Sequence, residues 1–589
     1  MTGRHKHLRR RLNLPGGAVV MLILILTSWA CKKQSGFLDR KGDAPLNEQV
    51  VFADSALTMD FLTGIYIGAD FNIQSGAVHN TSDFERLTDL AEGRYPATGN
   101  FDKQVTQGVF GPNFYSKMAT EWNFLYAKIR NVNIFLHNAE RWPLSVPLKI
   151  RLRAEARFLR AWYYHYLIRY FGGVPLLGDR VYAIEDQADL SRSTFGSCMS
   201  YLVSELDAIK SDLPLAYAGD DYGRVTRGAV LALKSRILVM AASPLFNGGS
   251  ISADPDLAKL TAYPTVDANR WVIAREAAKE VIDLGRYELM SDNATRPGNG
   301  FYKLFLTRVN SEFIFSRQYP SGKIMEISHN PKSRGGAWYF DYPTQELVDM
   351  FPMANGRPIV DPLSGYDPAE PYRDRDPRFG FTVMYNGSLY FLNTTKALAP
   401  VYTYSGGSDG IVAISSNTGT VTGYFHRKMC DEYAAVSGGN NVDRAVPLIR
   451  YAEVLLDYAE ACNESGQPAN ALAVLRSIRE RAGIQRGNDG LFGLPAAPST
   501  DQLRQLIQNE RAIELAFEGH RFWDLRRWKA GAQLDGRFVH GMSISLSGSK
   551  YTYQPINIRT RYFKDNLYLF PIPITELNLN PSIRQNPGW

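Results

Sequence analysis

The stretch from Arg151 to Leu177, RLRAEARFLRAWYYHYLIRYFGGVPLL, constrains the fold most. Apolar side chains recur in it at steps of three and four, which keeps one face of a 3.6-residue helix continuously apolar. Pro147 suits the first turn of such a helix, and Gly172 and Pro175 are typical of a helix end. The pattern therefore predicts a packed helix with both ends marked.

This helix is predicted to be covered on more than one side, because Trp162, Tyr164 and Arg169 lie outside its apolar face. A later segment, 269–284, spaces small residues for close contact between paired helices, a pattern that resembles tetratricopeptide hairpins without a strict repeat. We expect a mainly α fold, a tetratricopeptide-like helical array (an α/α superhelix) with long loops and a few short strands. The other expected helices are Asp54–Ile67, Phe114–Glu140, Thr194–Leu213, Thr226–Ala242, Asn269–Leu284, Arg450–Glu464, Pro468–Ala482 and Asp501–Trp528.

Residues 1–30 are predicted to be a signal peptide. Basic residues precede the apolar run AVVMLILIL at 18–26, which is too short to span a bilayer and suits the core of an export signal. Cys31 directly follows a small residue, which resembles a bacterial lipoprotein cleavage site, so we expect Cys31 to be lipidated. The alternative is ordinary cleavage beside a bystander cysteine. The polar residues 31–48 are then a lipid-anchored tether.

Most of the formal net charge of +7 lies in that leader. The leader carries five basic residues and no acidic one, which leaves +2 on the rest of the chain. A nearly neutral mature protein lacks the electrostatic footprint of a nucleic-acid-binding protein, so no nucleic-acid partner is expected. Three cysteines remain after Cys31, an odd number that argues against a disulfide framework, and buried free thiols are expected at Cys198 and Cys462.

Two regions follow the tether. Residues 49–290 are dense in helical patterns, whereas 291–589 begins with a loop-rich insertion at 292–447. Gly, Pro, Asn, Ser and Tyr dominate that insertion, and its short alternating pieces at 311–318 and 379–386 predict small strands. We expect the two regions to pack as one compact unit.

Five stretches distributed over almost the whole chain together carry a resemblance. They are AEARFLRAWYYHYLIRYFGGVPL at 154–176, PTQELVDMFPMANGRPI at 343–359, RDRDPRFGFTVMYNG at 373–387, NERAIELAFEGHRFWDLRRWKAG at 509–531 and LFPIPITELNLNPSIRQNPGW at 569–589. In this order, and behind a lipoprotein-like leader, they resemble the SusD/RagB family of nutrient-binding outer-membrane lipoproteins.

The resemblance implies a helical scaffold that is anchored in the outer membrane by lipid, faces the cell exterior and passes nutrient to a TonB-dependent barrel transporter. Oligosaccharide is the usual ligand class, and peptide is the alternative. No catalytic residue and no cofactor is implied. The family typically binds on a shallow aromatic platform, because the C–H face of a sugar lies on a ring while its hydroxyls need directed hydrogen-bond partners.

Two loop-rich regions, 83–110 and 319–342, are the candidate binding site, because family sites are built from insertions between helices. Both combine aromatic rings with amide or charged groups near glycine. The alternative for each ring is that it packs its loop onto the helical body. The candidate ligand-binding residues are Arg86, Tyr95, Phe101, Asn330, Arg334, Trp338, Tyr339 and Tyr342.

The 509–531 stretch itself is predicted to be structural. Its charged residues are expected to form an ion-pair network, and its large rings to be core. His165 and His520 are expected to be satisfied or surface histidines and not metal ligands. The charged residues are Arg511, Glu514, Glu518, Arg521, Asp524 and Arg526, and the rings are Phe517, Phe522, Trp523 and Trp528.

Other function classes have weaker support. The G-x-S-x-G match at 406–410 lacks a following helical pattern, which a nucleophile elbow needs, so a glycine-rich turn is expected. A surface glycosidase stays open, because two distant carboxylates leave no spacing signature; a purely structural lipoprotein is the third class. No metal is expected, since turn capping and ion pairing are favoured over calcium binding for Asp361, Asp367, Asp374 and Asp376.

Overall fold

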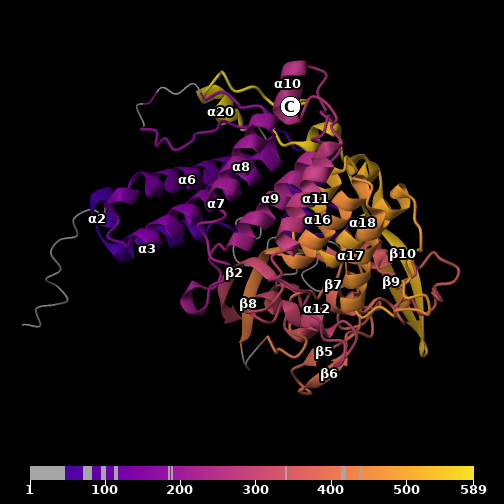
Figure 1. Cartoon of the computed structure of the whole chain (residues 1–589). Coiled ribbons are helices and arrows are strands. Elements are labelled where there is room, and N and C mark those ends of the chain that lie inside the picture. Colours follow the sequence, from indigo (N-terminus) through magenta and orange to yellow (C-terminus); the bar gives the residue numbers. More distant parts are fainter. Residues whose placement is uncertain are drawn as a thin grey trace, which may run out of the picture.

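The computed structural model (Figure 1) describes residues 47–70, 82–93, 101–111, 117–183, 186, 190–337, 341–412, 419–436 and 441–589. The predicted signal peptide and Cys31 lie outside these residues. Among the described helices, none combines the length and the apolar character that crossing a bilayer requires.

Helices are the predominant secondary structure of the described chain. In its N-terminal half they are α2 (Glu48–Phe52), α3 (Ser55–Tyr66), α4 (Ser82–Glu85), α5 (Phe101–Thr106), α6 (Lys117–His137), α7 (Val146–Phe171), α8 (Phe195–Ile209), α9 (Arg227–Ala242), α10 (Pro255–Thr261) and α11 (Asn269–Ile282). Further on they are α12 (Asn299–Leu304), α13 (Ile324–His329), α14 (Gln345–Met350), α15 (Pro377–Thr382), α16 (Tyr451–Glu464), α17 (Pro468–Arg481), α18 (Thr500–Glu514), α19 (Arg521–Arg527) and α20 (Ile574–Leu579). Short 3-10 helices lie at Ala139–Arg141, Gly219–Asp221, Lys332–Arg334, Gly531–Leu534 and Asp565–Tyr568.

The long helices form one continuous array. Each packs on the next, from α6 through α7, α8, α9, α11 and α16 to α17. In Figure 1 the array runs from the indigo helices α3 and α6 to the orange helices α17 and α18. The mainly α, tetratricopeptide-like array that the sequence predicts is confirmed.

Helix α7 is enclosed on several sides, as predicted. Pro147 lies in its first turn, and the helix ends at Gly172, whose φ of 76° favours glycine. Trp162 is fully buried and donates from its indole nitrogen to the carbonyl of Ala69 at 2.9 Å. The hydroxyl of Tyr164, also buried, accepts from the amide of Leu177 at 2.8 Å. Both faces of α7 therefore contribute to the core.

The described strands pair only as two-stranded antiparallel sheets. The hairpin of β9 (Phe538–Ser547) and β10 (Lys550–Thr560) was not predicted from the sequence. The others are β1 (Ala91–Glu92) with β3 (Tyr342–Pro343), β2 (Phe313–Gly322) with β8 (Val442–Arg450), β4 (Val383–Met384) with β7 (Phe425–His426), and β5 (Leu389–Leu392) with β6 (Ala397–Pro400).

One predicted strand begins as a helix. The piece at 379–386 forms the end of α15 followed by the short strand β4. The Asp376 side chain caps α15 by accepting from the amide of Arg378 at 2.9 Å, and Pro377 occupies the first turn. These start signals lie just before the predicted piece, and they override its alternating pattern.

The helix predicted at 501–528 is two helices, α18 and α19. Its start is as expected, because Ser499 forms a capping box with Gln502. The break follows Glu514, where buried Lys428 donates to the carbonyl oxygens of Glu514 and Ala516 at 2.9 and 2.8 Å. A side chain from a distant loop thus satisfies the carbonyls that would otherwise continue the helix.

The largest hydrophobic cluster contains residues from Phe52 to Ile583, so it extends across the predicted boundary at 290. The division into residues 49–290 and 291–589 stays a prediction. Cys198, Cys430 and Cys462 are buried and free, as expected for Cys198 and Cys462.

Candidate functional site

The two predicted loop regions are joined at their bases by β1 and β3. Glu92 of β1 lies opposite Tyr342 of β3, and Ala91 lies opposite Pro343. The amide of Thr344 also donates to the carbonyl of Leu90 at 3.1 Å. Segments that lie about 250 positions apart in the sequence therefore meet at one point, which no local pattern could predict.

A buried carboxylate fixes this junction. Glu92 is fully buried and forms ion pairs with Lys103, with Arg561 at 2.8 Å and with Arg559 at 3.3 Å. Burial alone would raise the pKa of Glu92, but the charges of Lys103, Arg561 and Arg559 outweigh it and lower the pKa to about 2. The junction therefore contains a permanently ionised carboxylate that ties α5 and β10 to β1.

The described candidate residues of the first loop region are interior. Arg86 is 8% exposed and pairs with Asp102 at 2.9 Å. Phe101 is 3% exposed and packs edge-on against Phe110, with ring centroids 5.6 Å apart. Both side chains support the loop from below and offer almost no surface to a large ligand.

The described candidates of the second loop region are interior as well. Asn330 and Tyr342 are fully buried, and the Tyr342 hydroxyl donates to the carbonyl of Gly419 at 3.2 Å. Arg334 is 8% exposed and donates to the carbonyls of Ala399 and Pro400 at 3.0 and 2.7 Å. These contacts pack the loop onto β6 and the 419–436 segment.

Tyr95, Trp338 and Tyr339 lie outside the described residues, so their role as a binding platform stays a prediction. Their described neighbours in the sequence are informative. Gly93 directly follows β1, and Asp341 directly precedes β3. The chain therefore enters both predicted aromatic segments from the same two-stranded junction.

A buried group of metal-ligand type also lies at this junction. The carboxylate of Asp341 is 2.9 Å from Nδ1 of His329 and 3.3 Å from Nδ1 of His426, and all three residues are buried. Burial lowers the pKa of His426 to about 4, so its ring is neutral at pH 7. Two imidazoles and a carboxylate are ligands that zinc prefers, and they also form a hydrogen-bonded cluster without a metal. Sequence reasoning missed this group because its members come from three separate segments.

Among the open clefts elsewhere in the described structure, two carry tyrosine rings beside polar side chains. The larger, about 740 Å³, lies between the 215–226 loop and the start of β2 and includes Tyr217, Tyr222, Tyr287 and Asn310. The other, about 460 Å³, lies between α6 and the C-terminal segment and includes Tyr126 and Tyr182. Both combine ring faces with hydrogen-bonding groups, and neither was predicted from the sequence, because their residues come from separated segments.

The charged run of the 509–531 stretch is interior and mostly paired, as predicted. Arg511 pairs with Asp524 at 3.0 Å, and Glu514 pairs with Arg450 at 2.7 Å and with Arg378 at 2.9 Å. Glu518 and Arg521 pair with Arg450 and Asp89. Phe517, Phe522 and Trp523 are buried.

Three predictions for the signature residues need correction. Arg526 is buried but has no carboxylate within ion-pair distance among the described residues, because its guanidinium lies over the ring of Phe522. Trp528 is only half-buried and donates to Glu460 at 2.7 Å. His165 is neither satisfied nor at the surface: it is fully buried, and within the described structure neither ring nitrogen has a hydrogen-bond partner.

The remaining sequence motifs are structural. The G-x-S-x-G match forms consecutive turns, as predicted, and its serine donates to the neighbouring Asp409 at 3.0 Å. Asp361 pairs with Arg357 at 2.8 Å, and Asp367 caps a turn by accepting from the amide of Ala369. Turn capping and ion pairing, the roles favoured for this aspartate group, are confirmed at both positions.

Comparisons with known proteins agree with this architecture. Two family models match: the one described as "SusD family" over residues 305–589, and the one described as "Starch-binding associating with outer membrane" over residues 36–239.

Individual relatives match over most of their length. The "SusD-like protein P25" of Formosa agariphila is 22% identical over 96% of this chain and 97% of its own. The "Starch-binding protein SusD" of Bacteroides thetaiotaomicron is 24% identical over 80% and 79%. A crystal structure of a SusD-like protein from Bacteroides fragilis is 26% identical, covers 92% of this chain and 98% of its own, and has a TM-score of 0.72. With both halves matched by family models and the helical array shared, this chain belongs to the SusD family.

Proposed function

We propose that this protein is a carbohydrate-binding lipoprotein of the outer membrane. It captures oligosaccharide at the cell exterior and passes it to a TonB-dependent barrel transporter, anchored through lipid on Cys31. Membership of a family with a starch-binding relative supports the carbohydrate class. No catalytic step and no nucleic-acid partner is part of this proposal.

The pairing of β1 with β3 is the observation that carries the choice of site. It joins the bases of the two loop regions in which the sequence concentrates aromatic, amide and charged residues. We propose that Trp338, Tyr339 and Tyr95 supply ring faces for sugar, and that buried Arg86, Phe101, Asn330, Arg334 and Tyr342 hold their segments in position. The three rings supply the apolar face on which the C–H groups of a sugar lie.

A binding panel tests the proposal. The purified protein is expected to be retained by one or a few polysaccharides in affinity electrophoresis and to give saturable heat in calorimetry with the matching oligosaccharide. Binding of peptides with no retention by any glycan would favour the peptide-binding alternative. Release of reducing ends from the retained polysaccharide would instead identify a surface glycosidase. A protein that binds neither class and turns over nothing would be a structural lipoprotein.

Anchoring and partnership have separate tests. Labelling with a radioactive fatty acid is expected in the native chain and absent in the Cys31→Ala variant. Protease treatment of intact cells is expected to degrade the protein, because it faces the exterior. Purification from detergent-solubilised outer membranes is expected to recover a TonB-dependent barrel; recovery of the protein alone would overturn the transporter part of the proposal.

A further inference from the structure

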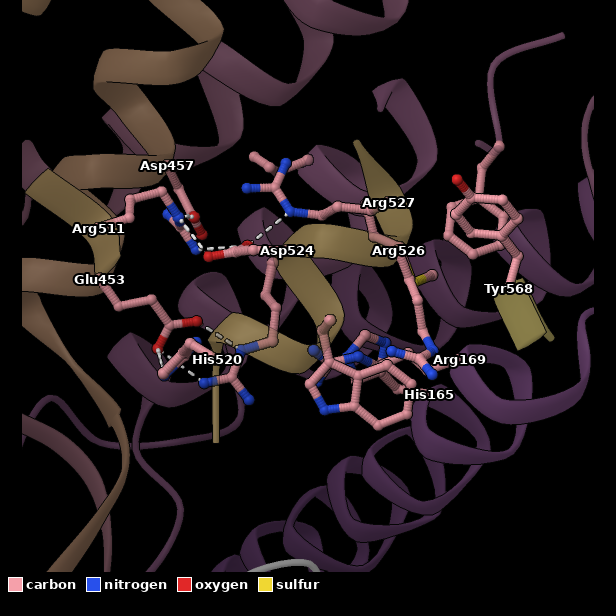
Figure 2. Close-up of a pocket in the computed structure, with 15 residues that line it drawn as sticks. His165, Arg169, Glu453, Asp457, Arg511, His520, Asp524, Arg526, Arg527 and Tyr568 are labelled. Carbon is pink, nitrogen blue, oxygen red and sulfur yellow. Dashed lines mark hydrogen bonds and ion pairs between the residues drawn. The ribbon is translucent and has the colours of Figure 1, made fainter. Parts of the chain in front are cut away.

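A small cavity lies where α7 faces α19. These helices belong to the 154–176 and 509–531 stretches that carry the family resemblance. The cavity volume is about 30 Å³. Figure 2 shows its lining, with His165 and Arg169 from α7 close to Arg526 of α19. Helices α9, α16 and α18 contribute further charged side chains, namely Arg236, Glu453, Asp457 and Arg511.

Part of the charge around this cavity is balanced. Arg236, Arg511 and Arg527 each have a carboxylate oxygen at 2.6 Å. Their partners are, in order, Glu453, Asp457 and Glu460. These pairs need no further counter-charge.

Arg169 and Arg526 are different, because neither has a carboxylate within ion-pair distance anywhere in the described structure. Arg169 lies over the ring of Trp523 at 4.1 Å, and Arg526 over Phe522 at 3.4 Å. Burial lowers the pKa of Arg169 to about 10, which still leaves it charged at pH 7. Arg526 is buried, and Arg169 is half-buried. Ring faces attract a cation but supply no net negative charge, so neither guanidinium group has an ion-pair partner among the described residues.

His165 adds an unused hydrogen-bonding group to the same place. It is fully buried, neither ring nitrogen has a partner, and Figure 2 shows it beside Arg169. Burial and the charges of Arg169 and Arg236 hold its pKa well below the usual range, so the ring is neutral and carries one N–H donor. A donor beside two unpaired guanidinium groups favours an anion as the missing partner.

The size of the cavity limits what that anion can be. A water molecule needs a cavity volume of at least about 10–15 Å³, so this cavity accommodates one or two water-sized ions or molecules. A sugar acid or a nucleotide phosphate would not fit. A halide ion would.

We propose that this cavity binds a small inorganic anion of chloride size, held by Arg169, Arg526 and the N–H group of His165. The anion balances the two guanidinium charges and joins α7 to α19. It is a structural ligand, independent of the nutrient and of the proposed glycan site.

Crystals of the unmodified protein soaked in sodium bromide test the site directly. An anomalous peak for bromide is expected between Arg169 and Arg526. An empty cavity, or one that contains only water, would overturn the proposal. This measurement needs no variant and therefore does not depend on whether a substituted protein folds.

Thermal unfolding provides the second test. At constant ionic strength, replacing sodium gluconate by sodium chloride is expected to raise Tm by about 1 °C for each tenfold increase in chloride above its Kd. Arg169→Gln is expected to remove this dependence. Arg153→Gln is the matched control, because it removes the same charge from an exposed position of the same helix, and it should keep the dependence. Equal Tm values in the two salts for the unmodified protein would contradict the proposal.

Discussion

The signature helices and the aromatic loops are the two parts of this chain that stand out most in its sequence, and the structure treats them differently. Around Glu514 the charges are enclosed and paired within the helical array. At the β1–β3 junction the charges are also enclosed, but the segments that continue from the strands contain the aromatic residues of the predicted platform. A charged motif can therefore be scaffold, while function is expected where loops leave that scaffold.

Glu514→Gln should have the largest effect on stability. It tests the scaffold role separately from binding. Glu514 pairs with Arg378, Arg450 and Arg481, and all four side chains are buried. Removing one partner leaves buried charges uncompensated, so the free energy of unfolding should fall by about 3–5 kcal/mol. Urea denaturation measures this change.

The control for that variant is Asp501→Asn on the same helix. The Asp501 side chain is 82% exposed, so the same change of charge should alter stability by less than about 0.5 kcal/mol. If Glu514→Gln folded with unchanged stability but lost glycan binding, the scaffold interpretation of α18 would be wrong.

Trp338→Ala should have the second-largest effect. It should lower the affinity for ligand and leave stability unchanged. Truncating a ring that stacks on ligand typically costs about 2 kcal/mol of binding free energy, a roughly 30-fold loss of affinity. The midpoint of urea denaturation should stay unchanged. Calorimetry with the retained oligosaccharide measures the first quantity.

Phe538→Ala is the matched control, because Phe538 is an exposed ring at the start of β9, outside both loop regions. It should leave affinity unchanged. Equal affinity in Trp338→Ala and in the unmodified protein would remove Trp338 from the proposed platform.

A pH experiment tests the contact that Glu85 of α4 makes between the first loop region and the 509–531 stretch. Burial raises the pKa of Glu85 to about 8, although one carboxylate oxygen accepts from the amide of Gly519 at 3.0 Å. Its folded-state pKa exceeds the unfolded value, so its contribution to stability is present below about pH 4.5 and is lost as pH rises towards 8.

Glu85→Gln should therefore gain stability relative to the parent between pH 5 and pH 8, by on the order of 2 kcal/mol. Denaturation at both pH values measures the gain. Asp60→Asn, on the exposed side of α3, should show no such gain. A constant difference between Glu85→Gln and the parent across this range would contradict the assignment.

Tyr342→Phe should have the smallest effect. It removes the hydroxyl that donates to the carbonyl of Gly419 at 3.2 Å and keeps the buried ring. We expect a loss of about 1 kcal/mol in unfolding free energy and no change in affinity beyond about twofold, since the ring supports the loop from inside. A large loss of affinity with unchanged stability would mean that Tyr342 contacts ligand.

Local patterns predicted the scaffold well. The apolar face and the end signals of α7 were sufficient for its position, and the predicted start at Asp501 lies one residue from the first residue of α18, Thr500. Predictions failed where a distant group intervened. Lys428 ends α18 from another loop, and Asp376 starts a helix where an alternating pattern predicted strand.

The candidate site was predicted as two separate regions, and their pairing was not predicted. The burial of Phe101 and Tyr342 could not be predicted either, because an aromatic residue in a loop has the same sequence pattern whether it faces solvent or core. The group of His329, Asp341 and His426 and the cavity between α7 and α19 could not be predicted either, because each combines residues from different elements.

The sequence by itself determined the helical array and the family, because periodicity, end signals and ordered motifs are properties of neighbouring residues. Only the tertiary structure decided which charges are balanced, which rings are buried and which loops share a base. Those properties depend on groups that lie far apart in the chain and within a few ångströms in space, where burial makes an unpaired charge costly. Glu514 and Arg526 show the difference, because one is paired and the other is not, although both belong to the same charged run.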